Sequence, residues 1–148
     1  MKYRSLPLLV VAALAAGLWN EFGAQLTTAD VSPPSAASSD AALEAAFRDR
    51  RSDLQIQGEG RVIAVLPDDN KGSRHQRFLL ELDSGLTLLI AHNIDLAPRI
   101  PDLARGDTVG FYGEYEWNDK GGVIHWTHHD PRGKHPDGWL QHSGARFD

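Results

Sequence analysis

Histidines in the second half of the 148-residue sequence are the residues best suited to chemistry. None of the seven precedes His75, and four of them fall between His125 and His135. Imidazole and carboxylate groups bind zinc and similar divalent ions where no thiolate is available, and the chain has no cysteine. The candidate ligands of a divalent metal ion, zinc by preference, are His125, His129, Asp130 and His135.

The spacing of these residues suggests how they meet. If residues 123–129 form a strand, His125 and His129 point to the same face, because alternate side chains of a strand share a face. Asp130 and Pro131 then turn the chain, so that His135 can fold back toward the pair. Two alternatives stay open: a metal-free network of hydrogen-bonded histidines, and solvent-exposed histidines without a special role.

A second polar group is expected on the outward face of the same sheet. One arginine, two carboxylates and an imidazole can hold an anion and supply an acid and a base. Ordinary cross-strand charge pairs use the same residue types, each contributing about 0.2–1 kcal/mol, and we favour that interpretation. The catalytic candidates are Arg77, Glu114 and His75, and the ligand-binding candidates are Arg77, Tyr112, Glu114 and Glu116.

The elements that must position these residues begin at Leu54, where the sequence takes on the alternating pattern of β-strands. A long first strand, a hairpin, a connector and a final hairpin follow one another in the order of a five-stranded OB-type barrel. We therefore expect an all-β fold, a small OB-like barrel over residues 54–148, with an unclosed sandwich as the alternative. The expected strands are 55–66, 76–82, 86–92, 108–117 and 123–129.

The N-terminus has the pattern of a signal segment for export. Lys2 and Arg4 precede a mostly apolar run, residues 6–19. A membrane-spanning helix needs about 20 apolar residues, so a cleaved signal is favoured over an uncleaved anchor in the inner membrane, and membrane contact is expected only here. The predicted location is the periplasm or the medium. The expected segments are a signal or anchor at 1–24, a disordered linker at 25–40 and a short helix at 41–53, capped by Asp40.

Four stretches of the sequence resemble the exported bacterial family catalogued as domain of unknown function 3465. They are DDNKGSRHQRF (68–78), AHNIDLAPR (91–99), GEYEWNDKGGVIHWTHHDP (113–131) and the closing GW (138–139). The resemblance spans residues 41–145 and implies export and one compact domain, but no catalytic residues. Residues 62–69 and 88–99 are also similar to thermonuclease-type OB nucleases. There Asp95 matches a calcium-binding carboxylate, but Arg99 stands where an acid is needed, so this second likeness implies the fold alone.

The function expected from these features is binding. A net charge of −5 argues against a general nucleic-acid binder, which usually shows a basic face. No complete catalytic signature is present, so we favour an exported binding module for an envelope or extracellular ligand: an oligosaccharide, a peptide or a metal ion. The alternative is a metal-dependent hydrolase that acts on a phosphodiester or another anionic substrate.

Overall fold

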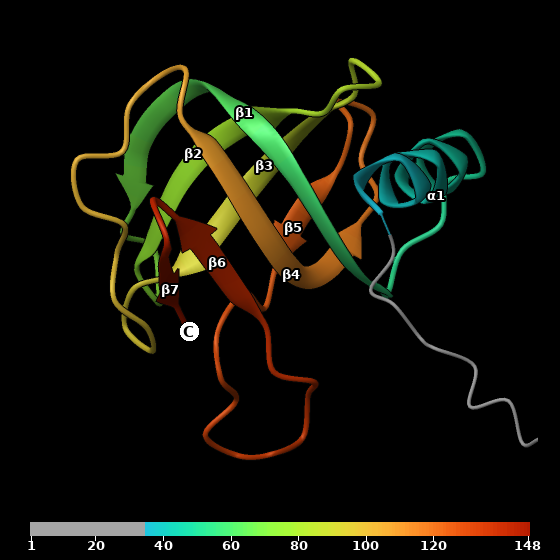
Figure 1. The fold of residues 1–148 in the computed structure, drawn as a ribbon. Helices are drawn as coiled ribbons and strands as arrows, with labels where there is room; N and C mark the ends of the chain where they lie inside the picture. The colour runs from blue at the N-terminus through green and yellow to red at the C-terminus, as the bar shows by residue number, and fades with distance from the viewer. Residues whose placement is uncertain (1–34) are drawn as a thin grey trace, which may run out of the picture. The chain divides into compact units, whose positions relative to one another are not determined.

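The computed structural model describes residues 35–148, so the expected signal segment and the first ten residues of the expected linker lie outside the described residues. One helix is followed by seven strands that form a single sheet (Figure 1). The prediction of a mainly β fold is therefore confirmed. The strands are β1 (Leu54–Asp69), β2 (His75–Glu81), β3 (Thr87–Asn93), β4 (Thr108–Glu116), β5 (Val123–His125), β6 (Trp139–His142) and β7 (Ala145–Phe147).

The long strand β1 belongs to two ladders. Residues 54–61 pair antiparallel with β4, and residues 61–69 pair antiparallel with β2. From β2 the pairing continues to β3, then parallel to β5, and from β5 antiparallel to β4. Two glycines of β1 allow close packing beneath it, because a Cβ on Gly58 would lie 2.5 Å from the Phe111 ring and one on Gly60 would lie 2.8 Å from the Glu81 carbonyl oxygen. The ladder order thus returns to the strand where it began.

The strands β2, β3 and β4 each bury one face, as the alternating pattern predicts. On β2, β3 and β4, buried residues alternate with partly exposed ones. The alternation would place Trp126 beside Ile124 in the core, but Trp126 has a positive φ of 53° and only Ile124 is buried there. The buried apolar residues of the sheet include Val62, Phe78, Leu80, Leu88, Ile90, Val109, Phe111, Tyr115, Ile124 and Leu140.

The helix α1 (Ala36–Arg48) begins and ends earlier than expected. Its N-cap is Ser35, whose hydroxyl oxygen accepts a hydrogen bond from the backbone N–H of Ser38. Asp40, expected as the cap, lies inside the helix, and its buried carboxylate accepts from the backbone N–H of Ser84 at 3.3 Å. The last residues of the expected linker therefore belong to the helix, which packs Leu43 against the core. Within residues 35–148, no helix is long and apolar enough to cross a membrane.

Two short strands near the C-terminus were not expected. β6 pairs with β4 over residues 109–112, and β7 pairs with β6. The turn between them is Ser143-Gly144, and both residues have positive φ, as a tight two-residue hairpin turn requires. These strands matter for function because β6 and the preceding loop, residues 126–138, bring new side chains to the outward face of β4.

Candidate functional site

Glu114 lies on the outward face of β4, between two histidines. His135 donates from Nε2 to one carboxylate oxygen at 2.6 Å, and Nε2 of His125 lies 3.3 Å from the other. The sheet register places His125 directly opposite Glu114, whereas His135 comes from the loop between β5 and β6. Glu116, two residues further along β4, brings an oxygen to 3.9 Å from the same His125 nitrogen. The fold thus gathers two carboxylates and two imidazoles.

The hydrogen bonds of His135 favour its charged form. Its Nδ1 lies 2.8 Å from the Pro136 carbonyl, so both ring nitrogens face acceptors, and only the imidazolium can donate to both. Burial by itself lowers the pKa of His135, but the hydrogen bonds to Glu114 and Pro136 and the charges of Glu114 and Asp130 outweigh it. The pKa is therefore raised above 6.5. The ring also stacks on Trp126, with centroids 4.1 Å apart and planes 9° from parallel.

His125 presents the opposite situation. Its Nε2 is buried and has no hydrogen-bond partner within residues 35–148, because the contacts with the two carboxylates lack hydrogen-bond geometry. On the other side of Glu114 in the same row of the sheet is Gln55, and both polar atoms of its buried amide also lack a partner among those residues. Three of the four such atoms in the described chain therefore lie in one row, beside Glu114.

The side chains of Glu114, Glu116 and His125 have the geometry to hold a metal ion. One ligand atom from each lies within 4.8 Å of the others. Two atoms that each lie about 2.0–2.1 Å from a zinc ion at a tetrahedral angle are roughly 3.4 Å apart, close to the 3.3 Å between His125 and Glu114. His135 would then orient Glu114 through its hydrogen bond, as partners of metal-binding carboxylates commonly do.

The other two expected ligands lie elsewhere. β5 ends at His125, so the prediction that His125 and His129 share a strand face is wrong. His129 is largely exposed and pairs with Asp137 at 2.9 Å. Asp130 is buried, and its carboxylate accepts from the backbone N–H groups of three loop residues; these bonds lower the pKa of Asp130 and hold the loop that carries His135.

A groove lies over β2, β3 and β5 beside this cluster. It consists of two adjoining hollows of about 310 and 380 Å³ that share His75, Ala91 and His125. The hollows are also lined by Arg77, His128, Arg132, Asp69 and Glu116. Of the catalytic and ligand-binding candidates, the structure therefore places His75, Arg77 and Glu116 in the groove.

Three other expected residues have different surroundings. Tyr112 lies on β4 but away from the groove, with its ring 6.2 Å from that of Trp139 on β6. Asp95 binds the backbone and side chain of Arg74 at 2.8 Å, and Arg99 pairs with Asp68 at 2.7 Å. Asp95, which matches the nuclease carboxylate, and Arg99, which does not fit that pattern, are thus both engaged in ion pairs.

One buried histidine has a structural role that the sequence did not indicate. His92 is fully buried, donates from Nε2 to the Pro98 carbonyl at 3.0 Å and bonds Thr127 through Nδ1 at 2.8 Å. Burial lowers the pKa of His92 to about 4, so this imidazole is neutral at physiological pH. It ties β3 to the start of the loop that carries His135.

One known family model matches the whole of the described domain. The family model described as "Protein of unknown function (DUF3465)" matches residues 25–148. The chain belongs to this family. The DUF3465 match includes α1, all seven strands and the cluster around Glu114. None of the curated proteins compared with the chain matches it.

Proposed function

We propose that this DUF3465 domain is an exported, OB-like binding module that holds a divalent metal ion, zinc by preference, at His125, Glu114 and Glu116. The observation that carries the proposal is the buried His125 Nε2, which faces two carboxylate oxygens at 3.3 and 3.9 Å without a hydrogen bond. A buried polar atom without a partner costs about 1–3 kcal/mol. An ion held between these three side chains removes that cost.

The OB-like part of the proposal is supported by the order of strand pairing. The ladders run β1-β2-β3-β5-β4 and return to β1, with β3 and β5 parallel (Figure 1). A five-stranded barrel of this kind binds ligands over the face of its second and third strands. The His-rich groove lies over the same two strands, with His125 where its two hollows join.

The composition of the groove favours an anionic ligand. Three protein ligands leave a zinc ion with at least one position for an outside group, and His125 and Glu116 both face the groove. Arg77 and Arg132 line the same groove and add fixed positive charge near that position. A carboxylate or phosphate group of an envelope or extracellular molecule fits these requirements.

The test is the metal content of the full-length protein and of two matched variants. After incubation with zinc and removal of free ion, we expect about one bound equivalent in the wild type and in His129→Ala, and none in His125→Ala. His129 is the control because it is a histidine of the same loop region that pairs only with Asp137. A chelator should lower the melting temperature of the wild type but not of His125→Ala.

Two results would overturn the metal proposal. One is a wild type that binds no stoichiometric zinc and melts identically with and without chelator. The other is equal metal content in the wild type and His125→Ala. In either case ordered water molecules would be the partners of His125 and Gln55, and the cluster would be a structural network.

A further inference from the structure

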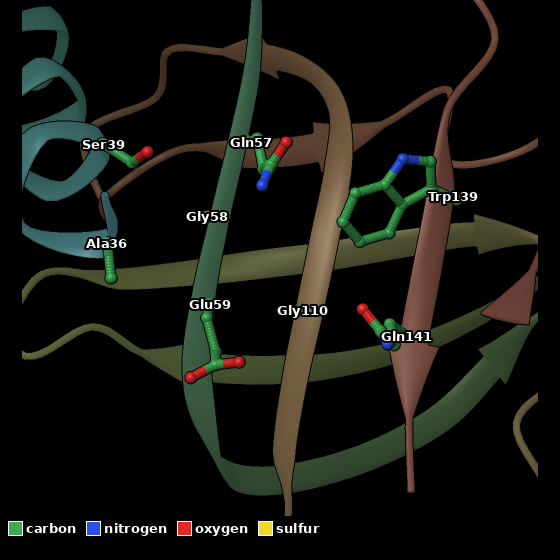
Figure 2. A pocket seen from close by; sticks show the side chains of 8 residues that line it. All are labelled: Ala36, Ser39, Gln57, Gly58, Glu59, Gly110, Trp139 and Gln141. Carbon is green, nitrogen blue, oxygen red and sulfur yellow. The ribbon is translucent and has the colours of Figure 1, made fainter. Parts of the chain in front are cut away.

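A separate hollow lies on another part of the sheet's outer face, across β1, β4 and β6 and beside the start of α1 (Figure 2). Its volume is about 210 Å³. Its lining shares no residue with the groove that contains His125. The polar and aromatic residues around it are Ser39, Gln57, Glu59, Trp139 and Gln141, and Gly110 forms its floor.

Gly110 is the reason that the hollow exists. The sheet register aligns Glu59, Gly110 and Gln141 in one row, and Gln57, Tyr112 and Trp139 in the next. Val109 and Phe111 are buried on the inner face, so Gly110 stands on the outer face. A glycine there leaves one empty place in an array of long side chains.

The fold itself does not require glycine at this position. Gly110 does not have a positive φ. A Cβ added to it would lie 3.6 Å from the Trp139 ring and 3.6 Å from Cβ of Gln141, which is ordinary contact. Glycine also weakens a strand interior, and it often marks a place where a ligand approaches the backbone closely. Glycine at position 110 therefore keeps the hollow open, whereas the strand does not need it.

The lining has the chemistry of a saccharide site. Trp139 offers an apolar ring, and Arg146 lies over that ring with its guanidinium carbon 5.0 Å from the centroid. The amides of Gln57 and Gln141 both donate and accept hydrogen bonds, and the Glu59 carboxylate accepts them. A sugar ring combines apolar C–H groups with a rim of hydroxyls that need both kinds of partner. Among residues 35–148, no Lys, Arg or His lines the hollow, so its lining does not favour an anion.

We infer that this hollow binds one ring of a neutral saccharide, with Trp139 against the ring and Gln57, Glu59 and Gln141 on its hydroxyls. The site is separate from the metal cluster in residues and in chemistry. Failure of either proposal therefore leaves the other standing.

The test uses two neutral probes, triacetylchitotriose and maltotriose, titrated into the full-length protein by calorimetry and by NMR of the Trp139 indole N–H. We expect at least one probe to bind with a dissociation constant on the order of 1 mM or tighter. Gly110→Val, which fills the hollow, should weaken that binding at least tenfold. Valine suits a strand, so the variant should fold. Thr108→Val, at an exposed place on the same strand, is the control and should bind as the wild type does.

Three outcomes would overturn the inference. The first is no binding of either probe by the wild type. The second is equal binding by the wild type and Gly110→Val, which would place the saccharide elsewhere. The third is a change in chemical shift of the Trp139 indole N–H on addition of tetramethylammonium but on addition of neither saccharide. That result would identify the hollow as a cation site. Gln57→Ala offers a second variant that leaves the strand backbone unchanged.

Discussion

Replacing Glu114 by glutamine tests the charged hydrogen bond at the centre of the cluster. The amide keeps the shape of the side chain and one acceptor but removes its charge. A hydrogen bond to a charged group contributes about 1.5–3 kcal/mol and a neutral one about 0.5–1.5 kcal/mol. Solvent screens the pair only weakly, because the side chains of His135 and Glu114 are 15% and 19% exposed. We therefore expect Glu114→Gln to lower the free energy of unfolding by about 1–1.5 kcal/mol at pH 6.

The loss should depend on pH in a definite direction. The pKa of His135 is raised in the folded protein above 6.5, its value in the unfolded chain. A raised pKa stabilises the fold fully below the unfolded pKa, and this contribution disappears as the pH rises through the folded pKa. The difference between the wild type and Glu114→Gln should therefore be largest near pH 6 and shrink toward pH 9. The charge of Asp130 remains in the variant, so a small residual dependence on pH is expected.

Urea unfolding at pH 6 and pH 9, with chelator present throughout, measures this difference without a contribution from bound metal. At pH 6 the change corresponds to a fall of about 4 °C in melting temperature for each kcal/mol in a domain of this size. A loss of the same size at both pH values would refute the reasoning, as would one that grows with pH. Either result would mean that His135 is not charged in the folded protein.

Three further predictions concern the loop, the helix and the N-terminus. Asp130→Asn removes the charge that holds three loop N–H groups. In hydrogen-exchange measurements, the amides of residues 132–135 should therefore lose protection, while those of β2 keep theirs. Unchanged protection of the loop would contradict this. Ser35→Ala removes the N-cap of α1 and should cost about 1 kcal/mol in chemical unfolding, whereas no loss would favour a helix start nearer Asp40. Changing Lys2 and Arg4 to glutamate should leave the protein in the cytoplasm on cell fractionation, and export of that variant would remove the basis of the signal assignment.

The fold could be predicted where the sequence alternates over many residues. The segments that became β2, β3 and β4 each carry three inward apolar or buried side chains, and their bounds were found to within one residue. β6 and β7 have four and three residues, which is too few for a period of two to stand out. The first turn of α1 is rich in alanine and serine, a composition that also suits a linker, so only its contacts with the core distinguish the two.

Only part of the candidate site could be predicted from the sequence, for a similar reason. The turn at residues 118–122 was expected, and counting outward from it pairs Glu116 with Val123 and Glu114 with His125. That register would have predicted that the carboxylates of Glu114 and Glu116 lie beside His125. The end of β5 at His125 depends on the positive φ of the next residue, Trp126, which its residue type does not favour. The position of His135 depends on how Asp130 folds the loop, which no periodic pattern records.

The parallel ladder between β3 and β5 has consequences for how the domain opens. Only two residue pairs, Leu89 with Val123 and Ile90 with Ile124, form this ladder, whereas β1 pairs over eight positions with β4. Local opening starts where few backbone hydrogen bonds must break together. We therefore expect the sheet to open first at the β3–β5 ladder. His125 is the last residue of β5, and the groove lies across the β3–β5 ladder. A ligand that lies in the groove against Ala91 of β3 and His125 of β5 would hold these two strands together, so that ligand binding and local opening of the sheet would be coupled.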